Sequence, residues 1–286
     1  MRELVVHRVG GPCLVQDAGR PGHAAVGVGS SGAADRASYD LGNRMVGNAA
    51  GAACLEVVLG DLEVEATATT WLCVTGAPVP LDVDGRAEPT GAVVRLRPGG
   101  RLRIGVPASG LRSYVAVRGG LDVTPVLGSR SRDTLGEVGP GPVRVGDRLP
   151  VGAATAGDIL VDAVPPQEYD AGPVLRVVRG PRDDWVTDPD ALVSRSWTVS
   201  AASDRVGVRL EGTPLVHLDP GRQLPSEGAL RGAIQLPPDG LPVVFGPDHP
   251  VTGGYPVIGV VVADDTDRLA QLRPGETVGF RFVSAQ

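Results

Sequence analysis

Short apolar runs, most of them rich in β-branched residues, alternate along this chain with glycine, proline and small polar residues. Runs of this length bounded by turn residues are typical of β-strands. The predicted strands are 4–9, 55–59, 71–74, 93–96, 102–106, 114–117, 175–178, 206–210, 241–245, 257–262 and 278–283. Because strands and helices do not alternate regularly, the pattern favours a mainly β chain of barrels or sandwiches over a doubly wound sheet.

Helical periodicity is confined to a few short segments. Apolar residues near helical spacing predict a helix over 35–46, which ends before a glycine suited to the C-terminal cap. An Asp-Pro pair predicts a turn of helix over 188–193, and a third helix is predicted over 266–272. Asp-Gly pairs at 84–85 and 239–240 predict tight turns.

The chain divides naturally near its middle. Residues 164–173 are polar and proline-rich, which is typical of a linker. The tetrapeptide Leu-Arg-Pro-Gly occurs once on each side, at 96–99 and 272–275, and a separation of that size suggests a duplicated domain. We therefore predict two domains, 1–165 and 173–286.

Composition narrows the possible chemistry. The 286 residues carry 27 basic and 33 acidic side chains, a net charge of −6, and only 3% aromatic residues, so nucleic acid is not an expected partner. Every basic side chain is arginine. The absence of lysine excludes Schiff-base chemistry through this chain and a lysine-bearing phosphate loop. Arginine remains able to clamp a carboxylate or a phosphate with two parallel hydrogen bonds.

The cysteines, the histidines and the hydropathy pattern indicate a soluble, cytoplasmic protein. Cys13, Cys54 and Cys73 are odd in number, widely spaced and in apolar surroundings, as expected of reduced thiols in a core. The four histidines show no metal-ligand spacing, so no metal site is predicted. No signal peptide is visible and no apolar stretch is long enough to span a membrane, so a membrane is not an expected partner.

Polar residues in the first third form three candidate sites. Asp17 and Arg20 lie three apart in a turn, where they either present a charge pair to a substrate or simply stabilise the turn. The segment 30–36 leads into the predicted helix, so its N–H groups can bind an anion, or Asp35 can cap the helix instead. Glu56 lies inside an apolar strand and needs a partner there.

Two further segments carry arginines that can bind anions. Ser129 and Arg130 belong to the segment 128–133, whose two arginines and two hydroxyls suit either a phosphate or a surface salt-bridge loop. Arg205 lies in the segment 203–212, where charged and apolar residues alternate as on a strand with one solvated face.

The last third is the richest in candidate chemistry, because glycines and prolines there display polar groups between buried strands. Thr252, Gly253, Gly254 and Tyr255 bring bare backbone next to a hydroxyl and a phenol, an arrangement that can cradle a developing oxyanion. Gln235 adds an amide that can donate and accept hydrogen bonds. No Gly-x-Ser-x-Gly elbow and no Ser/His/Asp set accompanies them.

Taken together, these motifs resemble the allophanate hydrolase subunit 2 family. That family includes the 5-oxoprolinase component PxpC, KipA-type proteins and the matching half of the urea carboxylase carboxyltransferase domain. The matching segments, in family order, are 15–22, 31–35, 127–131, 203–205, 226–228, 232–235 and 252–256. The chain departs from the family pattern at two places. Ala34 stands where the family usually has Met, and His-Pro-Val at 249–251 stands where Gln-Thr commonly precedes the Thr-Gly-Gly-Tyr-Pro motif of 252–256.

The resemblance implies two cyclophilin-like β-barrel domains with a few short helices and an obligatory subunit 1 partner (PxpB, KipI-like). Its leading interpretation is the PxpC component of a 5-oxoprolinase, a complex with a PxpA-like third subunit that uses ATP with Mg²⁺ to open the 5-oxoproline lactam. One alternative is a biotin-dependent carboxyltransferase that acts on urea or another amide and takes its biotin from a separate carrier chain. Another is a KipA-like regulator without turnover.

In both enzymatic interpretations the reaction takes place at an unreactive amide carbonyl, which requires stabilisation of charge on oxygen. The predicted catalytic residues are Gln235, Thr252 and Tyr255 as carbonyl-orienting groups, with Asp35 and Glu56 for proton handling or orientation. The predicted substrate- or anion-binding residues are Arg130, Arg205, Arg20, Ser129, Gly253 and Gly254.

Overall fold

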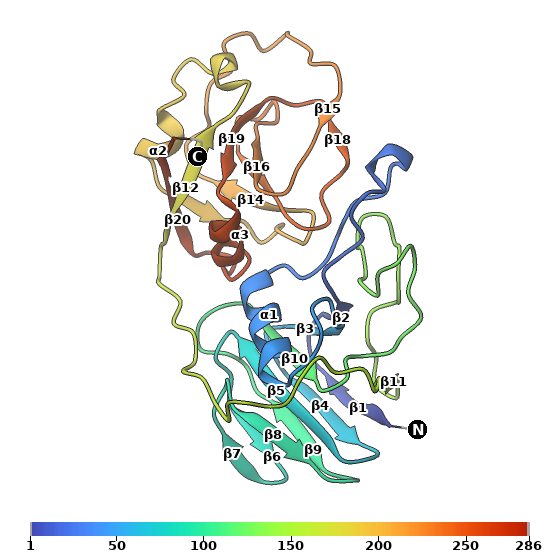
Figure 1. Ribbon diagram of the computed structural model, residues 1–286. Coiled ribbons are helices and arrows are strands. Elements are labelled where there is room, and N and C mark those ends of the chain that lie inside the picture. The colour runs from blue at the N-terminus through green and yellow to red at the C-terminus, as the bar shows by residue number, and fades with distance from the viewer. Residues whose placement is uncertain (1, 285–286) are drawn as a thin grey trace. The chain divides into compact units, whose positions relative to one another are not determined.

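The computed structural model describes residues 2–284, which form two compact units (Figure 1). The first unit takes in the chain up to Arg20, then Ser31–Asp133 and Glu137–Tyr169. The second takes in Pro21–Ser30, Thr134–Gly136 and the chain from Asp170 onward. The predicted mainly β fold with a few short helices is confirmed. Two short segments of the N-terminal half nevertheless belong to the second unit, which a single cut in the linker does not anticipate.

The first unit consists of two sheets and one helix. In the six-stranded sheet the order is β11 (Arg148–Pro150), β1 (Glu3–Val9), β4 (Leu62–Ala66), β9 (Arg101–Ile104), β6 (Leu81–Val83) and β7 (Arg86–Glu88). In the five-stranded sheet it is β2 (Cys13–Gln16), β3 (Cys54–Val58), β10 (Arg112–Val117), β5 (Thr70–Gly76) and β8 (Val93–Leu96). The helix is α1 (Arg36–Met45), which packs on β5 and β10.

The burial pattern of the strands follows from these layers. In β4, Leu62, Val64 and Ala66 point into the core while the two glutamates between them stay on the outer face, as period-two alternation requires. β10 is buried along its whole length because other parts of the unit pack against both of its faces. Val115 belongs to the main core of the unit, whereas Ala116 packs with Met45 of α1.

The second unit is built around a closed barrel of seven strands (Figure 1). Around the barrel they are β12 (Val174–Arg179), β19 (Val257–Val261), β16 (Ala233–Gln235), β17 (Val243–Phe245), β14 (Gly207–Glu211), β13 (Trp197–Val199) and β20 (Thr277–Phe282). The parallel pairing of β12 with β20 closes the barrel. A separate two-stranded sheet pairs β15 (Glu227–Gly228) with β18 (Thr252–Gly253).

Short helices complete the second unit. They are the 3-10 helices η1 (Ala24–Val26) and η2 (Asp183–Trp185) and the α-helices α2 (Ala191–Ser194) and α3 (Ala263–Leu269). α3 begins earlier than the predicted helix over 266–272, because Asp264 and Asp265 occupy its first turn, where acidic side chains favour the helix dipole.

The turn at 84–85 and the state of the cysteines are as the sequence predicts. Asp84 and Gly85 form the tight turn between β6 and β7, with φ of 52° and 82°, as a type I′ hairpin turn requires. The three cysteines are free and buried, as predicted. Burial raises the pKa of Cys13 and of Cys73 to about 12, so both thiols stay protonated.

Candidate functional site

In the first unit, two sequence-predicted clusters meet around the carboxylate of Asp17. Its Oδ1 accepts hydrogen bonds from Ser129 Oγ and Ser131 Oγ, both at 2.6 Å, and from the backbone of Gly19 at 2.8 Å. Its Oδ2 accepts from the backbone N–H of Arg130 at 2.5 Å. Asp17 is 5% exposed. A carboxylate with this many buried donors holds two loops together, which is the turn-stabilising alternative considered for it.

The two arginines of these loops are engaged by the protein. Arg20 is buried, and its guanidinium donates to the backbone carbonyls of Ser131 and Val126. Arg130 Nε donates to the carbonyl of Val123 at 2.8 Å, and its Nη2 contacts Asp122 Oδ1 at 2.7 Å. The structure therefore brings Arg20, Ser129 and Arg130 together, with protein oxygens as partners of the guanidinium groups.

Glu56 and Asp35 meet through Tyr114 beneath the start of α1. Glu56 Oε2 accepts from the backbone N–H of Ala34 and from the Tyr114 hydroxyl, both at 2.9 Å. That hydroxyl accepts from the backbone N–H of Asp35 at 2.7 Å. Burial first, and then the charge of Glu56, raise the pKa of Tyr114 well above its ordinary value, so the phenol stays neutral and keeps its donor.

Asp35 is the N-terminal cap of α1. Its Oδ1 accepts from the backbone N–H of Ser38 at 2.9 Å and its Oδ2 from Ser38 Oγ at 2.6 Å. This is the capping alternative for the segment 30–36, and it places a carboxylate where an anion bound to the helix start would lie. Participation of Asp35 and Glu56 in proton transfer stays a prediction.

In the second unit, Arg205 forms a buried, two-pronged ion pair with Asp248. Arg205 Nε lies 2.8 Å from Asp248 Oδ2, and Nη2 lies 3.0 Å from Oδ1. Thr134 donates to the same Oδ2 from its backbone N–H at 2.9 Å and from its Oγ1 at 2.8 Å. The anion held by Arg205 is thus a side chain of the protein, and the pair ties the loop before β14 to the loop after β17.

The two glycine-rich motifs of the last third lie side by side in the small sheet. Glu227 pairs with Gly253, and Gly228 pairs with Thr252. Gln235 lies at a register shift between β16 and β19, and such a bulge re-aims a side chain. The Gln235 Nε2 donates to the backbone carbonyl of Tyr255 at 3.3 Å. The motifs at 232–235 and 252–256 are thus joined through the amide of Gln235.

A pocket of about 510 Å³ opens next to this cluster. Its lining residues are Trp185, His217, Asp219, Pro220, Gly221, Arg222, Gln223, Leu224, Leu236, Pro238, Gly254, Tyr255 and Pro256. Of the predicted site residues, Tyr255 and Gly254 line it, and the Tyr255 side chain is half-exposed. Gln235 is buried behind the loop, while Thr252 and Gly253 belong to the paired strand and do not line the pocket. We refer to this cavity as the Tyr255 pocket.

Five polar residues of the Tyr255 pocket were not predicted from the sequence: Trp185, His217, Asp219, Arg222 and Gln223. Trp185 comes from the 3-10 helix η2, and His217 and Arg222 come from the loop that follows β14. His217 Nε2 lies 2.8 Å from the carbonyl of Pro237, and Arg222 lies with its guanidinium carbon 3.9 Å from the Trp185 ring centre. None belongs to a motif with a known spacing, so only the fold brings them to the site.

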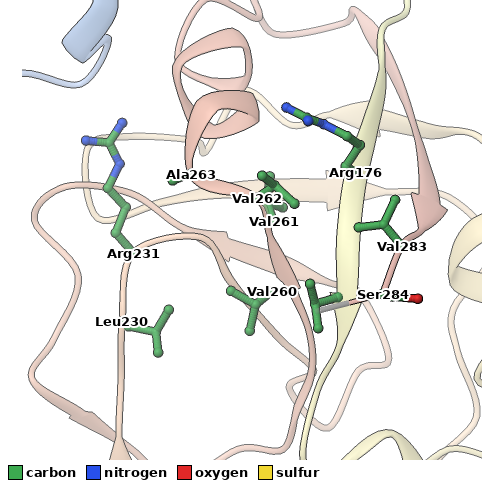
Figure 2. A pocket seen from close by; sticks show the side chains of 10 residues that line it. Arg176, Leu230, Arg231, Val260, Val261, Val262, Ala263, Val283 and Ser284 are labelled. Atoms are coloured by element: carbon green, nitrogen blue, oxygen red, sulfur yellow. The ribbon is translucent and has the colours of Figure 1, made fainter. Parts of the chain in front are cut away.

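A second pocket, of about 540 Å³, has five valines among its lining residues, of which Val178 lies in β12 and Val260 and Val261 lie in β19. Figure 2 shows Val260 and Val261 at the end of β19 and Val262 just before α3, with Arg176 and Arg231 as the cationic side chains around them. Both arginines have carboxylate partners, Arg176 with Asp265 at 2.9 Å and Arg231 with Asp267 at 3.0 Å. Because its charges are already matched, this pocket is a weaker candidate for a polar ligand than the Tyr255 pocket.

Within residues 2–284, no group of three or more His, Cys, Asp and Glu side chains is arranged to hold a metal ion. In the same part of the chain, no helix has the length and apolar character to cross a bilayer.

Comparison with known proteins places the chain in a family. The carboxyltransferase domain family, subdomains A and B, matches residues 26–282. The 5-oxoprolinase C subunit of Escherichia coli (strain K12) is 36% identical over 282 residues, which cover 97% of this chain and 90% of that protein.

Solved structures agree with this placement. TTHA0988 superposes with a TM-score of 0.88 at 33% identity over 98% of this chain, which spans 56% of the TTHA0988 chain. The Kluyveromyces lactis urea carboxylase superposes with a TM-score of 0.93 at 27% identity over 99% of this chain, which spans 27% of that longer chain. The chain therefore belongs to the carboxyltransferase domain family, subdomains A and B.

Proposed function

We propose that this chain is the PxpC component of an ATP-dependent 5-oxoprolinase complex, which opens the lactam of 5-oxoproline to give glutamate. The observation that carries the proposal is the similarity to the Escherichia coli 5-oxoprolinase C subunit, at 36% identity along nearly the full length of both chains. A second 5-oxoprolinase C subunit, from Haemophilus influenzae, is 30% identical over 95% of this chain.

The Tyr255 pocket is the proposed binding site for the lactam. Opening the ring breaks its C–N bond and adds water across it, and negative charge develops on the carbonyl oxygen along the way. The half-exposed phenol of Tyr255 supplies a donor for that oxygen. Gln235 acts as a positioning residue, because its amide holds the backbone carbonyl of Tyr255.

The proposal assigns ATP with Mg²⁺ to the complex and its triphosphate to the partner subunits. The chain has no lysine, and the arginines predicted as anion clamps, Arg20, Arg130 and Arg205, have protein oxygens as partners. The proposed partners are a subunit 1 (PxpB, KipI-like) protein and a PxpA-like third subunit. We place the complex in the cytoplasm, where three free cysteines persist in reduced form.

The test is ATP hydrolysis by the co-purified subunits, with and without 5-oxoproline. We expect stimulation by 5-oxoproline and loss of most of it in Tyr255→Phe, which removes only the hydroxyl. Tyr169→Phe is the matched control, because Tyr169 lies in the other unit and bonds Gln167. A hydrolysis rate indifferent to 5-oxoproline in the unmodified complex would refute the proposal.

A biotin-dependent carboxyltransferase is the second candidate, favoured by the family match and by the TM-score of 0.93 to a urea carboxylase. Because the chain has no lysine, the biotin must be carried by another chain. This candidate predicts that carboxybiotin is consumed when urea is supplied to the complex, and that 5-oxoproline leaves ATP hydrolysis unchanged.

A further inference from the structure

Two polar groups in the Tyr255 pocket lack partners within residues 2–284. The indole Nε1 of Trp185 is buried and has no hydrogen-bond acceptor, although the residue is only 6% exposed. The guanidinium of Arg222 lies over the Trp185 ring with 3.9 Å between its carbon and the ring centre, and it forms no ion pair. Other arginines of the same unit, such as Arg182 with Glu227, have carboxylate partners.

Both groups are of the kind that a carboxylate satisfies. A buried N–H without an acceptor destabilises the folded chain, and such an exception calls for an explanation. A cation stacked on an aromatic face retains its N–H donors for a further anion. Leu224, Leu236 and Pro256 form an apolar part of the wall, which also carries the polar residues His217, Asp219, Gln223 and Tyr255. Asp219, the acid among them, accepts from the backbone N–H of Gly221 at 3.0 Å.

We propose that Trp185 and Arg222 form a carboxylate-binding subsite of the Tyr255 pocket. The indole N–H donates to one carboxylate oxygen, and the guanidinium pairs with the same group. Because the indole Nε1 is covered, the carboxylate reaches it only when a neighbouring side chain moves. Arg222 is the side chain we expect to move, since it is exposed and lies just after the turn at Asp219 and Gly221. The class of ligand follows from the pocket alone, whereas naming 5-oxoproline as the ligand rests on the proposed function.

The subsite also separates the two candidate activities. 5-oxoproline carries a carboxylate next to its lactam, whereas urea carries none. A site that holds the carboxylate with Trp185 and Arg222 leaves the lactam carbonyl to Tyr255, and it rejects a neutral amide that cannot satisfy these groups.

The direct test observes the indole N–H signals of the full chain labelled with nitrogen-15 tryptophan. The chain has 3 tryptophans, and Trp185→Phe identifies the signal of interest. Trp197 is an internal control, because its Nε1 already donates to the carbonyl of Leu192 at 3.0 Å. We expect 5-oxoproline and cyclopentanecarboxylate to shift the Trp185 signal, and 2-pyrrolidinone, the lactam without a carboxylate, to leave it in place.

Two variants extend the test to affinity. Arg222→Leu should lower the binding affinity for 5-oxoproline and for cyclopentanecarboxylate about tenfold or more, since a hydrogen bond to a charged group is lost. The matched control is Arg209→Leu, an exposed arginine of β14 outside the pocket. In the assembled complex, Trp185→Phe and Arg222→Leu should raise the KM for 5-oxoproline about tenfold with little change in kcat, because the carboxylate is remote from the reacting carbonyl.

The outcomes distinguish the subsite from the proposed function. If neither carboxylate moves the Trp185 signal and both variants keep the KM of the unmodified complex, the subsite is refuted while 5-oxoprolinase activity stands. An equal shift with 2-pyrrolidinone also refutes it. If ATP hydrolysis ignores 5-oxoproline but cyclopentanecarboxylate still shifts the signal, the proposed function fails and the subsite holds for another carboxylate.

Discussion

Gly253 is the residue of the candidate site at which adding a single methyl group should have the clearest effect on stability. A Cβ on Gly253 would lie 2.6 Å from Gln235 Nε2, whereas a Cβ on Gly228 in the paired strand would meet nothing within 4 Å. Gln235 is buried, so its amide has little room to withdraw. We therefore expect Gly253→Ala to destabilise the chain by about 1–3 kcal/mol.

The same substitution should also disturb the pocket, because the displaced amide carries the carbonyl of Tyr255 with it. Thermal unfolding and 5-oxoproline-stimulated ATP hydrolysis of the complex measure the two effects. Gly228→Ala is the control and should change stability by less than about 0.5 kcal/mol. Equal behaviour of the two alanine variants would contradict the tight contact around Gln235.

At this scale the sequence predicted residue types well and their partners poorly. Asp17 was selected as half of a charge pair in a turn, Glu56 because a carboxylate inside an apolar strand needs a partner, and Arg205 as an arginine that can bind an anion. Their partners, however, lie far along the chain: Asp17 bonds Ser129 and Ser131, and Arg205 bonds Asp248. The Trp185 and Arg222 pair was missed for the same reason, since only tertiary folding brings the two side chains together.

At the scale of the element, the start of α1 separates a capping role of Asp35 from a catalytic one. Asparagine caps helices as well as aspartate does. In Asp35→Asn the side-chain oxygen can still accept from the Ser38 N–H. The new amide can donate to Ser38 Oγ, which is then free to donate to Gln167 Oε1, 2.6 Å away.

We therefore expect Asp35→Asn to preserve both stability and complex activity, and Asp35→Ala to lose about 1 kcal/mol of stability. Urea unfolding and the stimulated ATPase rate are the measurements. An Asn variant that folds normally but loses activity would show that the carboxylate itself takes part in proton transfer.

The helix α3 is attached to β12 by a carboxylate whose ionisation makes the attachment pH-dependent. Asp265 accepts from the backbone N–H of Arg176 at 2.6 Å and from its guanidinium at 2.9 and 3.0 Å. Burial alone would raise the pKa of Asp265, but these bonds and the arginine charge outweigh it, so its pKa lies below the ordinary value of 3.8. A carboxyl with a lowered pKa in the folded state stabilises the fold above its ordinary pKa.

Asp265→Asn should therefore cost about 2 kcal/mol at neutral pH, the typical size of a charged hydrogen bond. The deficit should shrink as the pH falls below 3.8 and through the lower pKa of the folded state, because the unmodified chain then loses the same interaction. Unfolding curves recorded across this acidic range provide the measurement. Asp264→Asn on the same helix is the control and should cost much less, since that side chain is 89% exposed and its contact with Arg176, at 3.9 Å, is screened by water.

The strands were the most predictable elements, whereas the pairing that closes them into a barrel was the least predictable feature. Short β-branched runs with period-two burial, as in β4, can be recognised from the local sequence. The barrel is closed by β12 and β20, which begin at residues 174 and 277, and no local pattern specifies such a pairing. The membership of Pro21–Ser30 and Thr134–Gly136 in the second unit was equally unpredictable, because it depends on where loops far from the linker find their partners.

At the scale of the whole molecule, Thr134 shows why the linker is not the only boundary that matters. It lies in the N-terminal half of the sequence, yet it belongs to the second unit and donates twice to Asp248 Oδ2. Asp248 has no exposed surface, so a donor lost there is not replaced by water. Thr134→Ala should therefore weaken the second unit, although the change is made in the first half of the chain.

Hydrogen exchange can locate that weakening. In Thr134→Ala we expect the amides of β14 and β17, which flank Arg205 and Asp248, to exchange about tenfold faster or more, because a hydrogen bond to a buried charge is removed. Amides of the first unit should keep their rates, and Thr124→Ala, an exposed position of that unit, should change neither set. Faster exchange in the first unit instead would show that Thr134 serves the unit to which its neighbours in sequence belong. Exchange confined to the barrel would show that this segment contributes to the fold of the half that carries the Tyr255 pocket.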